Sequence, residues 1–295
     1  MMKYVLMLSL ALALASCGNT SETNAGDSAR NLVDFDSVDS VDYSDSSAPA
    51  EWPRVVLKTT VGNLTLALNP EQKLHTANFL KLVKSKYYNG HLFHRVIKDF
   101  MVQTGDPKSI NAGPVAMLGD GGPNYVVPGE IKPNLYHFKG ALAAARQSDD
   151  VNPMKNSSGS QFFIVTGTLL DELHLKQSLE AQAFENFKQD PANRETILKG
   201  QALNQSGNMA AMRELETEVQ AKMQPIIDEL YAKMPSDVKQ RYNNWGGAPS
   251  LDNNYTVFGK LVSGYNVLSA IENEPTGSAD RPKKDVKIIE ASIQE

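Results

Sequence analysis

A single arginine stands among apolar residues in the stretch Phe93-His94-Arg95-Val96-Ile97-Lys98-Asp99-Phe100-Met101-Val102-Gln103-Thr104-Gly105-Asp106. Short runs rich in aromatic and β-branched residues predict strands. An unpaired charge inside a buried strand costs on the order of several kcal/mol, so Arg95 must have either a partner or a role. Gln103 and Gln161 likewise place amides where a plain core would hold aliphatic side chains.

Two further motifs follow in the chain. They are Ser157-Ser158-Gly159-Ser160-Gln161-Phe162-Phe163-Ile164-Val165 and Leu251-Asp252-Asn253-Asn254-Tyr255-Thr256-Val257-Phe258-Gly259-Lys260. The three motifs, in this order, resemble those of the cyclophilin-type peptidyl-prolyl isomerases. The resemblance covers residues 54–167 and 250–295 and leaves the segment 168–249 unexplained.

The alternating pattern of residues 54–69 predicts a hairpin turning at Val61-Gly62. Helices are predicted over Thr76–Tyr87 and Gly264–Glu272, from their apolar spacing and, for the first, the glycine that follows. Further strands are predicted at about His91–Ile97, Phe100–Thr104, Gly140–Arg146, Gln161–Val165, Tyr255–Leu261 and Asp285–Ile293. The fold that the resemblance implies is mainly β: a closed eight-stranded antiparallel barrel capped by two helices.

Residues 168–249 are predicted to be a helical insertion that interrupts a domain spanning 54–295. Asp190 precedes a proline, as expected for a cap followed by the first helical residue, and Ser236 is a second candidate cap. Between these two positions, the apolar spacing of residues Met209–Met234 predicts a long amphipathic helix that is bent at Pro225. The insertion is expected to overhang the substrate site, with a helical bundle packed on the flank of the barrel as the alternative.

The first residues indicate export. Residues 1–16 hold one charge and an apolar run too short to span a bilayer, the layout of a signal peptide. The run ends in Leu-Ala-Ser-Cys, which resembles the lipobox of bacterial lipoproteins, with Cys17 as the lipidated residue. We therefore expect a lipid-anchored protein of the bacterial cell envelope, at the outer membrane, with the face of that membrane left open. An ordinary secretory signal is the alternative.

Residues 17–53 predict an acidic, flexible tether. Residues 18–53 contain eight acids and one base, which leaves the remainder, 54–295, with a net charge of about +1. The acidity therefore belongs to the tether and argues nothing about the substrate. No nucleic-acid partner is expected. Its aspartates lack the turn glycine and the closing glutamate of a calcium loop, so no metal is expected.

The resemblance implies that Arg95 and Gln103 are catalytic, with Gln103 holding a substrate carbonyl. The implied substrate-binding residues are Phe100, Met101, Ala145, Arg146, Gln161, Phe163, Leu251 and Tyr255. Of these, Phe100, Met101, Phe163 and Leu251 form the pocket for the proline ring. Ala145 and Arg146 line the groove for the preceding residue, and Gln161 supports Arg95. His94, as the strand neighbour of Arg95, is expected to face the opposite side.

Three positions differ from the common family pattern. Tyr255 stands where many eukaryotic members have histidine, and Arg146 stands where asparagine is usual. Ser250 replaces a frequent tryptophan, which argues against tight cyclosporin binding.

The predicted function is cis/trans isomerisation of Xaa-Pro bonds in exported proteins, which assists their folding. The partners are proline-containing peptides and unfolded exported chains, and no cofactor is required because no bond is made or broken. Contact with the membrane is expected only through the lipid. The alternative is a chaperone or assembly module that binds through the groove and the helical insertion.

Overall fold

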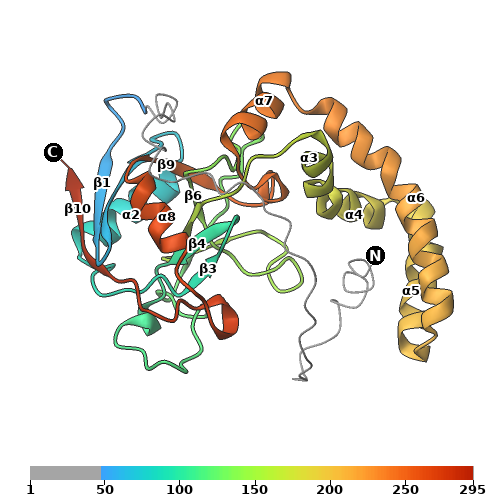
Figure 1. The fold of residues 1–295 in the computed structure, drawn as a ribbon, viewed down its shortest axis with the longest axis horizontal. Helices are drawn as coiled ribbons and strands as arrows, with labels where there is room; N and C mark the ends of the chain where they lie inside the picture. The colour runs from blue at the N-terminus through green and yellow to red at the C-terminus, as the bar shows by residue number, and fades with distance from the viewer. Residues whose placement is uncertain (1–47, 295) are drawn as a thin grey trace, which may run out of the picture.

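The computed structural model describes residues 48–294, and its centre is an eight-stranded antiparallel sheet in the order β10-β1-β2-β9-β6-β8-β4-β3 (Figure 1). The strands are β1 Arg54–Thr59, β2 Gly62–Leu68, β3 Arg95–Ile97, β4 Met101–Thr104, β6 Ala141–Ala144, β8 Phe162–Val165, β9 Val257–Ser263 and β10 Ile288–Gln294. A separate pair is formed by β5 Val126–Val127 and β7 Ser157–Ser158. The eight predicted strands are confirmed, with shifted ends.

The sheet does not close into the expected barrel, because its two edge strands are not paired with each other in the described residues. Within the described residues, β3 and β10 are the two edges of the curled sheet. Residues 91–94 run beside the start of β10 through an isolated bridge between Leu92 and Lys287 and a hydrogen bond from the Phe93 N–H to the Val286 oxygen at 2.9 Å. Because β3 is only three residues long, it cannot extend the ladder to β10, and the sheet remains open.

Two helices cover the sheet's apolar core: α2 Lys73–Lys84 and α8 Tyr265–Glu272. Phe79 and Leu82 from α2 and Leu268 from α8 lie in the same buried cluster as the inward-facing residues of the strands. The predicted first helix is placed three residues too late. Its true start offers no signal in the sequence, because Gln72 caps α2 without a side-chain hydrogen bond among the described residues.

The segment 168–249 is helical, as predicted. Its helices are α3 Glu172–Ser178, α4 Glu180–Gln189, η4 Pro191–Asn193, α5 Arg194–Ser206, α6 Met209–Lys233 and α7 Ser236–Trp245. Asp190 is a cap, since its carboxylate accepts from the Ala192 N–H at 2.9 Å. The prediction for Ser236 is wrong: it is the first residue of α7, Pro235 precedes it, and the structure shows no side-chain cap bond for this helix in the described chain. α6 runs through Pro225 and bends along its length (Figure 1).

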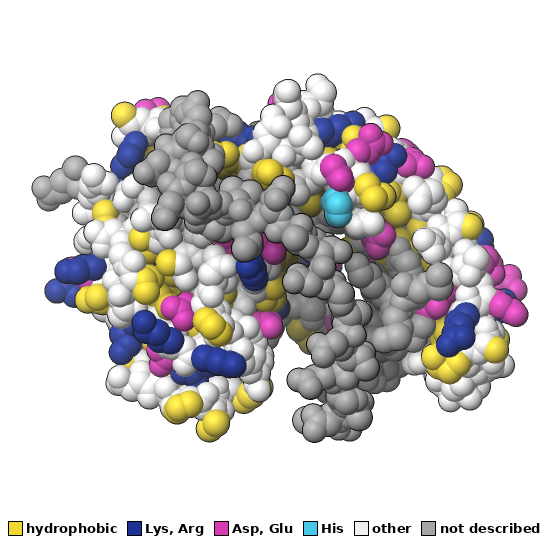
Figure 2. All heavy atoms as spheres, viewed as in Figure 1, with side chains coloured by type: hydrophobic (Ala, Val, Ile, Leu, Met, Phe, Trp, Pro, Cys, Tyr) yellow, Lys and Arg dark blue, Asp and Glu magenta, His cyan; other side chains and the backbone are white. Residues whose placement is uncertain are grey.

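The insertion has a base and an arm. The base is α3 and α7, whose buried residues, Tyr242 among them, pack against Tyr136 and Phe138 of the body. The arm is α4, α5 and α6, which share a small apolar cluster of their own and project away from the sheet (Figure 1). Acidic and basic side chains are interspersed on the outer side of the arm (Figure 2), for example the pair Lys222–Glu218 at 2.8 Å. This surface is the solvated face of the arm.

Gly247 closes the base of the insertion. Its backbone forms bridges with both Phe138 and Thr168, which ties the end of the insertion to its beginning. Its φ is +150°, and an added Cβ would lie 2.4 Å from the backbone oxygen of His137. Only glycine fits this position, because a side chain would meet rigid backbone.

The described chain begins inside the predicted tether. Trp52 is half-buried, and the backbone oxygen of Pro53 accepts from the Leu68 N–H at 2.9 Å. The end of the predicted tether is therefore part of the body. The signal peptide, Cys17 and the tether up to residue 47 lie outside the described residues. No helix within residues 48–294 is long and apolar enough to cross a membrane.

Candidate active site

The register of three neighbouring strands brings the predicted catalytic residues together. Arg95 on β3 is directly opposite Gln103 on β4, and Gln103 is opposite Phe163 on β8. Directly opposed residues share a face of a sheet, and their neighbours lie on the other face. Val96, Val102 and Ile164 accordingly point into the core. The alternation seen in the sequence thus sends one row inward and leaves the polar row on the outer face.

This outer face carries a pocket of about 480 Å³. The sheet forms one wall of this pocket. The other three walls are the loop 114–120, the short helix η5 Pro249–Leu251, and the turn η6 Ser278–Asp280 with the residue that follows it. Its apolar side is formed by Phe100, Met101, Ala145, Phe163, Leu251 and Tyr255. Met101 and Phe163 are only 2% and 4% exposed, so the floor is dry and fixed. The structure thus brings together nine of the ten predicted catalytic and binding residues in one pocket.

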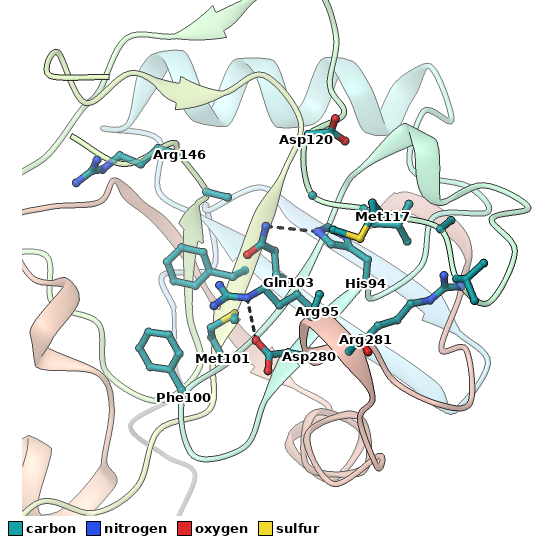
Figure 3. Close-up of a pocket in the computed structure, with 18 of the residues that line it drawn as sticks. His94, Arg95, Phe100, Met101, Gln103, Met117, Asp120, Arg146, Asp280 and Arg281 are labelled. Carbon is teal, nitrogen blue, oxygen red and sulfur yellow. Dashed lines mark hydrogen bonds and ion pairs between the residues drawn. The ribbon is translucent and has the colours of Figure 1, made fainter. Parts of the chain in front are cut away.

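Arg95 projects over this floor (Figure 3). Its Nε lies 3.4 Å from a carboxylate oxygen of Asp280, and both side chains are about half-exposed. An exposed pair of this kind contributes about 0–1 kcal/mol to stability, so its main effect is to orient the guanidinium group. Asp280 lies far from Arg95 in the sequence, on a turn where Ala279 and Asp280 both have φ near +57°. Such left-handed non-glycine residues are concentrated at functional sites.

Gln161, the tenth residue, supports Gln103 instead of Arg95. The Nε2 of Gln103 donates to Gln161 Oε1 at 2.9 Å, and Gln161 donates in turn to the backbone oxygens of Gly119 at 3.0 Å and Gly121 at 2.6 Å. The sequence-based role of Gln161 is therefore corrected. Its amide links the catalytic row to the loop that forms the opposite wall.

The prediction for His94 is also wrong. Its ring lies in the pocket, with Nε2 3.4 Å from Gln103 Nε2 (Figure 3). The alternation rule does not apply because β3 begins only at Arg95, so His94 precedes the strand. Burial lowers the pKa of His94 below its usual value, which keeps the ring neutral at pH 7. A neutral His94 can accept a hydrogen bond from Gln103 and adds no charge beside Arg95.

Arg146 is held against the aromatic wall. Its guanidinium lies 4.6 Å from the centre of the Tyr255 ring, and its Nε donates to the Asn254 oxygen at 2.7 Å. Tyr255 in turn meets Phe163 edge to face at 5.7 Å. The arginine that replaces the usual asparagine therefore fixes the tyrosine that replaces the usual histidine, and both line the pocket.

A buried polar network lies beneath the floor. Asp252 accepts from the backbone N–H of His137 at 2.8 Å, and the same oxygen is 2.9 Å from His137 Nδ1. Its other oxygen accepts from the Tyr242 hydroxyl at 2.6 Å. The His137 ring stacks on Phe163 with an interplanar angle of 16°. Burial raises the pKa of Tyr242 far above its ordinary value, so this tyrosine remains a donor. The network connects helix α7 of the insertion to the pocket floor.

Within residues 48–294, no group of three or more His, Cys, Asp or Glu side chains is arranged to hold a metal ion. Besides the carboxylates of Asp120 and Asp280, the groups that face the pocket are hydrogen-bond donors, amides and apolar side chains. This arrangement can bind an extended peptide, hold an apolar ring and offer a permanent cation to a developing lone pair.

Comparison with known proteins agrees with this chemistry. Residues 54–187 and 201–293 match the family of cyclophilin-type peptidyl-prolyl cis-trans isomerases. A Staphylococcus aureus protein named as a peptidyl-prolyl cis-trans isomerase is 30% identical over 243 residues, which cover 82% of this chain and 92% of the relative. The chain belongs to the cyclophilin-type peptidyl-prolyl cis-trans isomerases. The isomerase class predicted from the motifs is thereby confirmed.

Two further similarities are more limited. A Streptococcus pyogenes protein named as a bifunctional phosphatase/peptidyl-prolyl cis-trans isomerase is 32% identical over 239 residues, and the match spans 80% of this chain but only 37% of that protein. A solved cyclophilin of Cryptosporidium parvum has a TM-score of 0.48 and 22% identity, with 83% of this chain and 98% of that chain covered.

Several pocket residues are missing from the sequence-based set. Asp280 and Arg281 come from a turn with no motif of its own, and their place in the pocket depends on contacts across more than 160 residues. The apolar run Pro-Val-Ala-Met-Leu at 114–118 is visible in the sequence, since five apolar residues between glycines are unusual for a loop. That run is the one signal that could have indicated this wall.

Proposed function

We propose that the pocket isomerises Xaa-Pro bonds in unfolded segments of exported proteins. The observation that carries the proposal is the placement of Arg95 and Gln103 opposite each other, beside a dry apolar floor that can hold a proline ring. The solved Cryptosporidium cyclophilin was also crystallised in the presence of the dipeptide Ala-Pro. We assign this chain a substrate of the same kind, a proline preceded by a small residue.

The chemistry requires no covalent step. Rotation about an Xaa-Pro bond faces a barrier of about 18–20 kcal/mol because amide resonance must be lost. As the bond twists, the proline nitrogen regains a lone pair that can accept a hydrogen bond. Arg95 carries only donors and never loses its charge, so it stabilises the twisted amide without acting as an acid.

Catalysis is tested by exchange NMR on a short Ala-Pro peptide. We expect the protein to bring cis and trans signals into exchange at catalytic concentrations. An exchange rate equal to that of the peptide alone would exclude isomerase activity, and the binding-module alternative would then be favoured.

We also place the protein at the bacterial cell envelope, anchored through Cys17. The support is the signal-like residues 1–16 and the lipobox-like sequence around Cys17. A Cys17→Ser variant should lose palmitate labelling and move from the membrane fraction to the soluble fraction. Unchanged fractionation would contradict the anchor, while the isomerase activity of the soluble variant should match that of the wild type.

We propose that the arm of the insertion guides long substrates. Helices α3 and α4 both contact η5, which supplies Leu251 to the pocket. Among the described residues none of α3–α7 lines the pocket itself. The arm therefore stands beside the entrance, where it can meet a polypeptide but not a tetrapeptide.

Removal of the arm alone separates guidance from catalysis. The ammonium group of Lys176, near the end of α3, lies 5.0 Å from the centre of the Tyr231 ring, so residues 180–230 can be replaced by a short Gly/Ser bridge. This deletion keeps α7 and its Tyr242–Asp252 bond. We expect the tetrapeptide rate to stay within about twofold, while the rate for a proline-limited refolding protein falls several-fold.

Equal changes for the two substrates would contradict guidance by the arm. Full deletion of 168–249 is the less useful variant, because it also removes the tyrosine that bonds Asp252. A chaperone role would instead appear as suppression of aggregation that is retained in Arg95→Ala and lost with the arm.

A further inference from the structure

The pocket has an apolar wall that the isomerase chemistry does not use. Val115 and Met117 line the same pocket as Arg95, yet their side chains are 93% and 82% exposed. They belong to the run of five apolar residues at 114–118. Single exposed apolar residues need no explanation, but a cluster bordering a binding pocket marks a contact surface.

The wall is held in place from both ends. The guanidinium of Arg281 donates from Nη1 to the Gly113 oxygen at 2.7 Å and forms an ion pair with Asp285 at 3.1 Å. At the other end, the Gly119 N–H donates to the buried carboxylate of Asp106. Arg281 is only 9% exposed, so its bonds fix the loop's position. The apolar side chains are thus presented to solvent on an anchored loop.

The same turn links this wall to the catalytic arginine. Asp280 contacts Arg95, and its chain neighbour Arg281 holds the loop. Figure 3 shows Met117 and Phe100 on opposite sides of Arg95 and Gln103. Consider a peptide that places its proline on the Phe100 side and the preceding residue near Ala145. The part of this peptide that follows the proline then runs past Arg95. The chain after the proline then reaches the wall.

We propose that the loop 114–118 is a docking surface for an apolar side chain on the one or two residues that follow the proline. The occupant is the substrate chain itself, because the wall is continuous with the pocket that receives the proline. The inference rests on the proposed isomerase function. It adds a preference for substrates with apolar residues after the proline, and unfolded segments expose such residues. Contacts made by a flanking residue can also be used to position the reacting bond.

The test compares two peptides that differ only after the proline, one with leucine and one with serine. We expect kcat/KM of the wild-type protein to favour the leucine peptide by about three- to tenfold, below the roughly 10- to 200-fold of an enclosed hydrophobic pocket because this wall is open to solvent. Met117→Ser, and Val115→Ser with it, should reduce this preference to less than about twofold. The matched control is Met154→Ser: Met154 is 78% exposed but does not line the pocket, so the preference should remain.

A preference that survives Met117→Ser, or that falls equally in Met154→Ser, would overturn the docking surface. A second readout does not depend on catalysis. The methyl resonance of Met117 should shift on titration with the leucine peptide and much less with the serine peptide. A shift without any isomerisation would support the docking surface and contradict the proposed isomerase activity. Isomerisation without a shift or a preference would support the isomerase activity and contradict the docking surface.

Discussion

Replacing Arg95 with alanine is expected to lower kcat/KM for an Ala-Pro peptide by about 10²- to 10³-fold, the effect of removing one preorganised donor from a transition state. This corresponds to roughly 3–4 kcal/mol of the barrier at about 1.4 kcal/mol for each factor of ten. The rest of the acceleration comes from the floor that holds the ring, so the variant should retain weak activity. Peptide affinity should change less than the rate, because the donor acts mainly on the twisted bond.

Stability should be almost unaffected by this change. Arg95 is about half-exposed, and its ion pair with Asp280 is long at 3.4 Å. Lys98→Ala is the matched control, since Lys98 is a cation in the same hairpin that does not line the pocket. Arg95→Lys should recover little activity, because the ammonium group lacks the planar fork of the guanidinium. Wild-type exchange rates in Arg95→Ala would show that the donor is not needed.

The strands could be predicted because alternation is a local property, whereas the catalytic roles of Arg95 and Gln103 were implied by the family resemblance. Alternation fixes which residues share a face, and it places Arg95 and Gln103 together as soon as the two runs are paired. The same rule gave a wrong answer for His94, because β3 begins at Arg95, four residues after the predicted start at His91. Short strands make such errors frequent, since their ends are set by neighbouring segments and not by their own sequence.

The other corrections have the same origin. Gln161 supports Gln103 because the backbone oxygens of Gly119 and Gly121 hold its amide, and the geometry of that loop is not written in the motif. The ladder stays open between β3 and β10, although the number and order of strands suggested closure. The positions of Asp280 and of the wall at 114–118 depend on a turn near the end of the chain. The apolar run could therefore indicate a wall, but no local pattern could place it or Asp280 beside Arg95.

A second large effect is expected from Asp252→Ala, this time on stability. The Asp252 side chain is 5% exposed and satisfies three donors: the backbone and ring of His137 and the hydroxyl of Tyr242. Alanine leaves these donors buried without a partner, and each such group costs about 1–3 kcal/mol. We expect a loss of about 3–5 kcal/mol, the range for breaking a buried charged network. For a domain of this size the fall in Tm is about 2–4 °C per kcal/mol.

Tyr242→Phe measures how much of this stability comes from the hydrogen bond that the insertion contributes to the network. It removes one hydroxyl donor, 2.6 Å from the carboxylate, and should cost about 1.5–3 kcal/mol, as for other hydrogen bonds to charged groups. Tyr231→Phe is the matched control, because the Tyr231 hydroxyl makes no hydrogen bond to the described residues, whereas its ring contacts Lys239. If the two residues act through one bond, Tyr242→Phe should add little in the Asp252→Ala background.

The network should also affect the pocket, because Asp252 follows Leu251 directly and the His137 ring lies against Phe163. At a temperature where Asp252→Ala is folded, its KM for a tetrapeptide should rise more than its kcat falls, since the floor binds the ring while Arg95 acts on the twisted bond. A Tm for Asp252→Ala within about 2 °C of the wild type would show that the buried contacts contribute little. A large stability loss with unchanged KM would mean that the network secures the insertion and leaves the proline floor unaltered.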